Sequence, residues 1–177
     1  MGEDRTSSAG DDTNAGSGIG EELTPGRDAF MSRVEVSLDD AYRLATVLLL
    51  DEAAAGDAVH RAALRAWARY RRRRGAVINF ATWFLGIVAR ECRRLRRWRL
   101  LTLRGGPGLS HGSAMAEALV SSSPGTRAAL FCRYYLDLPA DEVAHILGMS
   151  PGGVESRVRR AERRLGTALE QDEVLRP

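Results

Sequence analysis

The sequence predicts an all-α chain made of two small helical domains that are joined by a flexible linker. Apolar residues recur at three- and four-residue steps through most of the chain from residue 37 onward, which is the period of an amphipathic helix. No stretch of useful length alternates polar and apolar residues, as a half-buried strand would. Residues 100–114 are Gly-rich and interrupted by Pro, which is typical of a linker.

The N-terminal residues 1–33 are rich in Gly, Ser, Thr, Asp and Glu and poor in large apolar side chains. Such a segment cannot bury enough apolar surface to offset the entropy lost on ordering, so we expect a disordered acidic tail. Residues 1–40 hold ten acids and three arginines, whereas residues 41–177 hold 13 acids and 23 arginines. The body is therefore basic, which favours a polyanionic partner, and nucleic acid is the commonest one.

The first helical domain is expected over residues 37–99 as a three-helix bundle. Ser37 is a candidate N-cap for its first helix, which carries apolar residues at helical steps as far as the leucines before residue 51. A second helix is expected over about 53–70, where it meets a run of arginines, and a third over about 79–98.

The third of these helices combines aromatic rings with arginines. Single-stranded nucleic acid is held by stacking on aromatic side chains and by basic contacts to the backbone, so this helix is a candidate single-strand surface. Trp83 and Phe84 cannot both face away from the bundle, so at least one of them belongs to the core, and Phe80 and Trp98 are the better stacking candidates. The accompanying arginines are Arg90, Arg93, Arg94, Arg96, Arg97 and Arg99.

The second helical domain is expected over residues 115–170 and ends in a helix-turn-helix. A short helix near 115–120 and a helix that is capped by Ser123 precede this motif. Pro139 is expected to open the first helix of the motif, and Gly148 can take the left-handed conformation that ends a helix. Ser150 then caps the second helix, with a proline in its first turn.

This second helix has one apolar and one basic side. Val154, Val158, Ala161 and Leu165 share a face, and the residues beside or opposite them are mostly arginines. A basic second helix has the geometry to enter the major groove, although an ordinary helical hairpin with a solvated arginine face is the alternative. The candidate DNA-binding residues are Ser150, Gly153, Glu155, Ser156, Arg157, Arg159, Arg160, Arg163 and Arg164.

Glu155 is an acid near the start of this basic helix. A carboxylate cannot donate to guanine, but it can accept from the amino group of cytosine, so Glu155 is a candidate for base recognition. The alternative is that it stabilises its own helix start, where an acid interacts favourably with the macrodipole.

Several classes of function lack their sequence signals. We find no Gly-rich phosphate loop and no Ser/His/Asp arrangement, so we do not expect an enzyme. No histidine has Cys or carboxylate partners at metal-ligand spacing, so we expect no metal and no cofactor. Cys92 and Cys132 are expected to be buried reduced thiols, with a redox switch as the alternative. The N-terminus is polar and residues 44–50 are too short a run to span a membrane, so we expect a cytoplasmic protein without membrane contact.

A basic three-helix domain, a linker and a C-terminal helix-turn-helix together resemble bacterial RNA polymerase sigma factors of the extracytoplasmic-function class, over residues from about 37 to 169. Residues 53–70 are similar to the helix that docks on the polymerase clamp, and residues 80–90 to the promoter-melting helix. The similarity is strongest in residues 123–165, at Arg127, Leu138, Glu142, Val143, Ala144, Leu147, Gly148, Ser150, Val154, Ser156, Arg157, Arg160, Ala161 and Leu165.

The resemblance implies a sigma region 2-like three-helix bundle and a sigma region 4-like helix-turn-helix domain. Region 2 would bind core RNA polymerase and melt the minus-ten element, and region 4 would bind the minus-thirty-five element of promoter DNA. An anti-sigma factor would be a further partner. The implied residues are Asp57, His60, Leu64 and Trp67 for core polymerase, and Phe80, Trp83, Arg90, Arg93, Arg94, Arg97 and Trp98 for promoter melting.

The sequence departs from the family pattern mainly in region 2. Gly56, His60 and Ala63 stand where the clamp helix usually has an acid, Gln and Phe, and Arg90 and Arg94 stand where the melting helix usually has Asn and Asp. One alternative function is therefore a DNA-binding helix-turn-helix regulator with a degenerate region 2 that does not activate polymerase. Another is an interaction protein that acts as a decoy for an anti-sigma factor.

Overall fold

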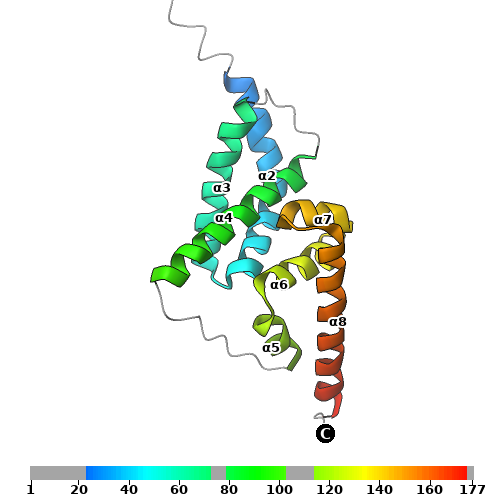
Figure 1. The fold of residues 1–177 in the computed structure, drawn as a ribbon. Helices are drawn as coiled ribbons and strands as arrows, with labels where there is room; N and C mark the ends of the chain where they lie inside the picture. Colours follow the sequence, from blue (N-terminus) through cyan, green and yellow to red (C-terminus); the bar gives the residue numbers. More distant parts are fainter. Residues whose placement is uncertain (1–22, 73–78, 103–113, 175–177) are drawn as a thin grey trace, which may run out of the picture.

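The computed structural model describes residues 23–72, 79–102 and 114–174, and describes the backbone alone at 23–25, 98–102, 114–116 and 168–174. The regular structure in these ranges is helical throughout, which confirms the all-α fold class (Figure 1). In chain order the elements are α2 (Leu23–Leu49), α3 (Glu52–Arg72), α4 (Phe80–Thr102), α5 (Ala114–Ser121), α6 (Pro124–Leu130), the π-helical η1 (Phe131–Tyr135), α7 (Ala140–Leu147) and α8 (Pro151–Val174).

The helices α2, α3 and α4 pack against one another and form the predicted three-helix bundle (Figure 1). The chain turns sharply between α2 and α3 because Leu50 adopts a left-handed conformation, with φ of 53°. The carboxylate of Asp51 then accepts a hydrogen bond from the backbone N–H of Ala54 at 2.9 Å, which stabilises the start of α3. Both α3 and α4 lie close to the ranges that the hydrophobic periodicity predicts.

The first helix is longer than the sequence pattern predicts, because α2 begins at Leu23. The expectation of a disordered tail is therefore wrong for residues 23–33. Phe30 is only 3% exposed, and its ring centroid lies 5.2 Å from that of Trp67 and 5.3 Å from that of Tyr70. These long-range ring contacts favour helix formation in a segment whose own composition does not. The remainder of the predicted tail, residues 1–22, lies outside the described residues.

The second half of the chain begins with α5 near its predicted position. Ser123 caps α6 as predicted, since its hydroxyl accepts a hydrogen bond from the backbone N–H of Thr126 at 3.2 Å, and Pro124 is the first residue of the helix. The chain continues into η1, a π-helical turn that the sequence did not predict, and α7 and α8 follow.

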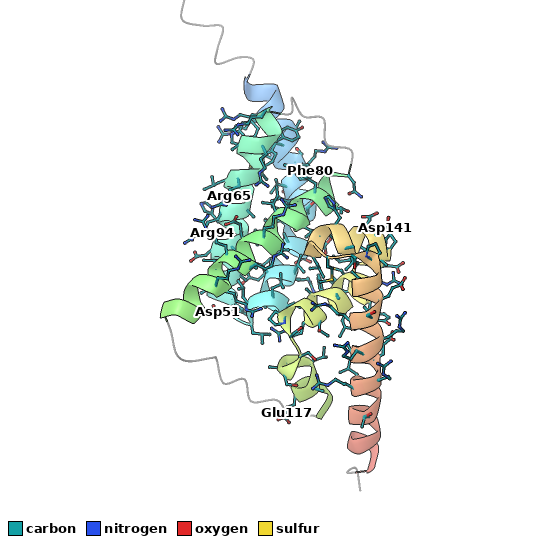
Figure 2. All side chains as sticks on the ribbon, in the orientation of Figure 1. Asp51, Arg65, Phe80, Arg94, Glu117 and Asp141 are labelled. Atoms are coloured by element: carbon teal, nitrogen blue, oxygen red, sulfur yellow. The ribbon has the colours of Figure 1, made fainter. Side chains whose placement is uncertain are left out.

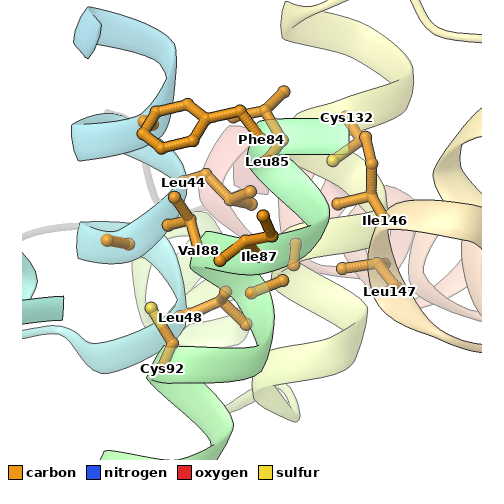
Figure 3. Packing of buried hydrophobic residues seen from close by; sticks show 14 of the residues in the cluster. Leu44, Leu48, Phe84, Leu85, Ile87, Val88, Cys92, Cys132, Ile146 and Leu147 are labelled. Carbon is orange, nitrogen blue, oxygen red and sulfur yellow. The ribbon is translucent and has the colours of Figure 1, made fainter. Parts of the chain in front are cut away.

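The two halves are packed together on one continuous core. Helix α7 lies across α4, and α6 contacts α2. In Figure 3, Leu44 of α2, Ile87 of α4, Cys132 of η1 and Ile146 of α7 converge. The predicted linker falls mainly on residues 103–113, which lie outside the described part of the chain. The predicted elements of both halves are therefore present, but the halves share a core that the sequence pattern did not predict.

Cys92 and Cys132 are buried and unpaired, as predicted. Burial raises the pKa of each thiol to about 12, so both carry their proton at neutral pH. Within the three described ranges, no helix is long and apolar enough to cross a membrane. The same ranges contain no group of three or more His, Cys, Asp and Glu side chains placed to hold a metal ion.

Candidate nucleic-acid interface

The predicted helix-turn-helix is formed by α7 and α8. Gly148 ends α7 in the left-handed conformation, with φ of 63°, and the N–H of Met149 donates to the carbonyl of Ala144 at 3.0 Å. The hydroxyl of Ser150 accepts from the N–H of Gly153 at 3.2 Å and so caps α8. The capping residues act as the sequence predicts, except that α7 begins one residue later, with Pro139 as its N-cap.

Helix α8 separates its apolar and basic sides as predicted. Val154, Val158 and Ala161 are buried against the rest of the chain, and Leu165 is half-buried. The long polar side chains lie on the exposed side of the helix. These exposed residues are Glu155, Ser156, Arg157, Arg159, Arg160, Glu162, Arg163 and Arg164.

A polar hollow of about 430 Å³ lies between the start of α6 and the basic helix α8. Its walls carry three arginines and four hydroxyl groups, and no acidic side chain lines it. Guanidinium and hydroxyl groups are the usual side-chain partners of phosphate oxygens. The lining residues are Ser122, Ser123, Thr126, Gly153, Ser156, Arg157, Arg160, Ala161 and Arg164.

Gly125 leaves the space that one of these arginines occupies. A Cβ atom at Gly125 would lie 2.9 Å from Nη1 of Arg157, which is closer than such atoms approach each other. A larger residue in the first turn of α6 would displace the guanidinium group. Gly125 thus allows Arg157 to extend from α8 over α6 and close one side of the hollow.

Glu155 does not stand alone on the exposed side of α8. One oxygen of its carboxylate lies 3.5 Å from Nη1 of Arg159, one helical turn further along, and both side chains are more than half exposed. An exposed pair of this kind contributes only about 0.3–0.5 kcal/mol to stability. It nevertheless brings a hydrogen-bond acceptor and a donor to the same place on the exposed side of α8.

The aromatic residues of α4 are less exposed than the sequence suggests. The sequence favours Phe80 over Trp83 and Phe84 as a ring on which a base could stack. In the structure, however, Phe80 is only 6% exposed, and its ring centroid lies 5.8 Å from that of Phe30. The preference for Phe80 as a stacking ring is therefore wrong for this conformation, because the bundle buries that ring. Phe84 is fully buried and Trp83 is half-buried against Phe80. The side chain of Trp98 lies outside the described residues.

The arginines of α4 point in different directions. Arg90, Arg94 and Arg97 are exposed, and Arg94 lies on the side of the bundle away from α8 (Figure 2). Arg93 instead points toward α7, where its Nη1 donates to the carbonyl of Leu147 at 3.0 Å. Desolvation lowers the pKa of Arg93, because α4 and α7 enclose part of its side chain. The predicted basic surface of α4 is thus divided by the contact with α7.

Helix α3 places Asp57, His60 and Leu64 on one exposed face, since they follow one another at three- and four-residue steps. Leu64 is 59% exposed, so this face presents one apolar side chain among polar ones. Trp67 does not extend this face. It is half-buried beside Phe30, and the guanidinium carbon of Arg71 lies 5.6 Å from its ring centroid.

Sequence reasoning did not identify the part of the hollow that α6 contributes. Ser122 and Thr126 have no charge, and a serine-rich segment before a helix is normally interpreted only as a cap. Their position beside Arg160 depends on how α6 packs against α8, and no local pattern encodes that approach.

Comparison with known proteins identifies the motif and the fold. Residues 117–165 match the family model described as sigma-70, region 4. The whole structure is similar to the sigma factor RpoE in its co-crystal structure with the anti-sigma factor NepR from Bartonella quintana. The TM-score is 0.68 and the identity is 22%, over 81% of this chain and 98% of that chain. A search of curated proteins found no significant match.

These matches confirm the resemblance at two levels. Residues 117–165 carry the sequence pattern of sigma-70 region 4. Over 81% of its length, the chain shares the fold of RpoE.

Proposed function

We propose that this chain is a sigma factor that directs core RNA polymerase to specific promoters and initiates transcription there. Its region 4-like half, α5 to α8, binds the minus-thirty-five element, and its region 2-like half, α2 to α4, binds core polymerase and melts the minus-ten element. The chain acts through binding energy directed at melted DNA and performs no covalent chemistry. Its place of action is then the cytoplasm, where core polymerase is found.

The exposed side of α8 is the observation that carries the proposal. Its arginines extend along one side of a helix that is correctly capped for a helix-turn-helix, inside the segment that matches region 4. With α8 in the major groove, the hollow between α6 and α8 receives a backbone phosphate, which Arg157, Arg160 and Arg164 neutralise. Glu155 and Arg159, which form an exposed pair on α8, are then the residues that contact base edges in this proposal.

The assignment of region 2 rests on the surfaces of α3 and α4. The exposed face with Asp57, His60 and Leu64 presents an acid and an apolar side chain to core polymerase. Arg90, Arg94 and Arg97 supply the basic contacts to DNA on α4, beside the half-buried ring of Trp83. RpoE was crystallised with an anti-sigma factor, and we propose a regulator of the same kind as a partner of this chain.

Run-off transcription by purified core polymerase, with and without this chain, tests the proposal. Promoters are first selected from a random library, because the sequence does not specify the preferred site. Transcripts that depend on the chain support the proposal. Asp57→Arg should reduce capture of core polymerase, whereas Asp28→Arg, the same charge change on an exposed position of α2, should not.

A DNA-binding regulator without polymerase activity is the second candidate. It is favoured by Gly56, His60 and Ala63 of α3, which stand where sigma factors usually carry an acid, Gln and Phe. A chain that selects specific duplex DNA, but neither captures core polymerase nor supports run-off transcription, would establish this second function.

A further inference from the structure

We propose that Ser123 is a phosphorylation site, and that its phosphoryl group enters the hollow between α6 and α8 and binds the arginines that would otherwise contact DNA. The competition with DNA rests on the proposed function, because that function assigns a backbone phosphate of the promoter to the same hollow. The binding of a phosphoryl group by these arginines does not rest on it, since it follows from the side chains that line the hollow.

The hollow has the side chains that a phosphoryl dianion needs. Arg157, Arg160 and Arg164 follow one another at three- and four-residue steps on one side of α8, and all three are exposed. Within the described part of the chain, none of the three forms a salt bridge, and no acidic side chain lines the hollow. An anion that enters the hollow therefore gains charge-assisted hydrogen bonds without displacing an internal carboxylate.

The four hydroxyl groups of the hollow differ in how open they are to a modifying enzyme. Ser122 is 8% exposed and donates to the carbonyl of Ala118 at 2.8 Å, and Thr126 is half-buried. Ser156 is exposed but lies within helix α8. Ser123 is exposed and lies between two helices, with an extended backbone at φ of −60° and ψ of 147°. A protein kinase binds its target segment in an extended conformation, so Ser123 is the hydroxyl that fits.

Ser123 lies at the turn of α6 that Arg157 reaches. The hydroxyl oxygens of Ser123 and Thr126 are 2.8 Å apart, and Gly125 lies between these two residues in the chain. A Cβ atom at Gly125 would lie 2.9 Å from Nη1 of Arg157, so the guanidinium group lies against this turn. A phosphoryl group on Ser123 is thus added at the wall of the hollow that Arg157 closes.

The modification is the transfer of the γ-phosphoryl group of ATP by a Ser/Thr protein kinase. A bond forms between Oγ of Ser123 and the γ-phosphorus, and the bond from that phosphorus to the bridging oxygen of ATP breaks. ADP leaves, and the hydroxyl proton passes to a base of the kinase. The product carries a charge of about −1.5 to −2 at pH 7 and three acceptor oxygens, which match the donors of the guanidinium groups.

Phosphorylation then opposes DNA binding in two ways. The phosphoryl group is tethered beside the arginines, so its effective concentration there is on the order of millimolar, and a DNA phosphate has to displace it. Its negative charge also repels the DNA backbone over roughly a Debye length. The modified chain keeps its fold and loses the phosphate contacts of Arg157, Arg160 and Arg164.

The first test installs phosphoserine during synthesis of the full chain, either at position 123 or at position 121. Ser121 is the matched control, because it is exposed and does not line the hollow. By phosphorus NMR, the second pKa of the phosphoserine at 123 should fall about 1 below its ordinary value of about 6, because the arginines favour the dianion. The pKa at 121 should stay near that value.

The melting temperature gives a second readout of the same contact. Phosphoserine at 123 should raise it, and Arg157→Ala should reduce both this rise and the lowering of the pKa. Equal pKa values at the two positions would overturn the proposal. A chain that is less stable with phosphoserine at 123 than without it would do the same, because the hollow would then not hold the group.

The functional arm measures the affinity for random duplex DNA at several salt concentrations. Phosphoserine at 123 should weaken binding at least about tenfold at low salt and lower the slope of log affinity against log salt by about 2–3, since three phosphate contacts are lost. Phosphoserine at 121 should weaken binding less and change the slope by less than about 1. A lowered pKa at 123 with an unchanged slope would overturn the competition with DNA.

Mass spectrometry of the tryptic peptide 105–127 from the cells that make this chain tests whether the modification occurs. The phosphate should lie on Ser123, and its absence in both growing and stressed cells would overturn the assignment. Failure of the proposed function is separate, since it appears as a lack of run-off transcription by the unmodified chain.

Discussion

Glu91 and Arg127 are charged side chains that are buried within the described core, and each connects segments that are far apart in sequence. Glu91 is the single acid in the arginine-rich residues 61–104, and its carboxylate lies 2.8 Å from Nη1 of Arg65. Among the described residues, Arg127 donates to the backbone carbonyl groups of Val47, Val120 and Ser122. A buried ionised group is tolerated only when it is hydrogen-bonded, so both positions are sensitive to substitution.

Replacing Arg127 by Met should destabilise the chain by about 2–3 kcal/mol, because one buried and two partly buried carbonyl groups lose their donor. Chemical denaturation followed by circular dichroism measures the free energy of unfolding. Arg163→Met, which removes an exposed arginine from α8, is the matched control and should change stability by less than about 0.5 kcal/mol. Equal effects of the two substitutions would contradict the buried role of Arg127.

The two buried thiols predict a loss of stability at alkaline pH. Burial raises the pKa of Cys92 and Cys132 from the ordinary 9.0 to about 12. As the pH rises, the unfolded chain therefore loses the thiol protons at a lower pH than the folded chain does. The contribution of the buried thiols to stability is full below pH 9 and falls as the pH rises toward 12.

Ellman's reagent at pH 8 should label neither thiol in the native protein and both in denaturant. Rapid labelling of the native protein would show that a thiol is accessible.

Glu155→Gln should change the DNA preference of the chain at one base pair. Glutamine keeps the shape and an acceptor oxygen but adds donors and removes the charge that pairs with Arg159. Selection of binding sites from random DNA compares the wild type with this variant. If both select the same site, Glu155 acts only on its own helix, for which a contribution of about 0.3–1 kcal/mol is typical.

At the scale of the element, the position of the arginines on α8 follows from the helical period of its apolar residues rather than from its net charge. Val154, Val158 and Ala161 direct one side of the helix into the core, and that alone places the arginines together on the other side. The caps at Gly148 and Ser150 define where the helix starts relative to the turn. The candidate interface on α8 is therefore a consequence of local rules and could be predicted.

The double substitution Arg160→Ala, Arg163→Ala should weaken binding to all duplex sequences and reduce the slope of log affinity against log salt by about 2. Each arginine that contacts a phosphate releases about one counterion on binding. Arg69→Ala, Arg72→Ala is the control, because it removes the same charge from exposed positions of α3. Equal slopes in the two double variants would place the phosphate contacts elsewhere.

At the scale of the whole molecule, the start of α2 and the contact between the two halves both depend on contacts between segments that are far apart in the sequence. Phe30 and Val34 are buried between helices that begin some twenty and fifty residues later, so their segment is helical despite a composition typical of disorder. In the same way, α7 covers one side of α4 by contacts across more than fifty residues, from Arg93 to Leu147.

Two N-terminal deletions distinguish the effect of the acidic residues 1–22 from that of the start of α2, which follows them. Deleting residues 1–22, which hold six acids and one arginine, should leave the melting temperature unchanged and raise the affinity for random duplex DNA at low salt. Deleting residues 1–33 should also destabilise the fold by about 3–5 kcal/mol, because the ring of Phe30 is lost from the core. A lower melting temperature after the shorter deletion would show that residues 1–22 support the fold.

The amino-acid sequence by itself determined the helical class, the bundle helices α3 and α4, and the helix-turn-helix with its caps and its basic side. These features depend on hydrophobic period and on hydrogen bonds between residues that are three or four positions apart, so a linear pattern records them. Only the tertiary structure decided that Phe80 is buried, that Arg93 binds the end of α7, and that α6 completes a polar hollow beside α8. Each of these depends on which helices meet, and that choice is made by the packing of the whole core rather than by any local segment.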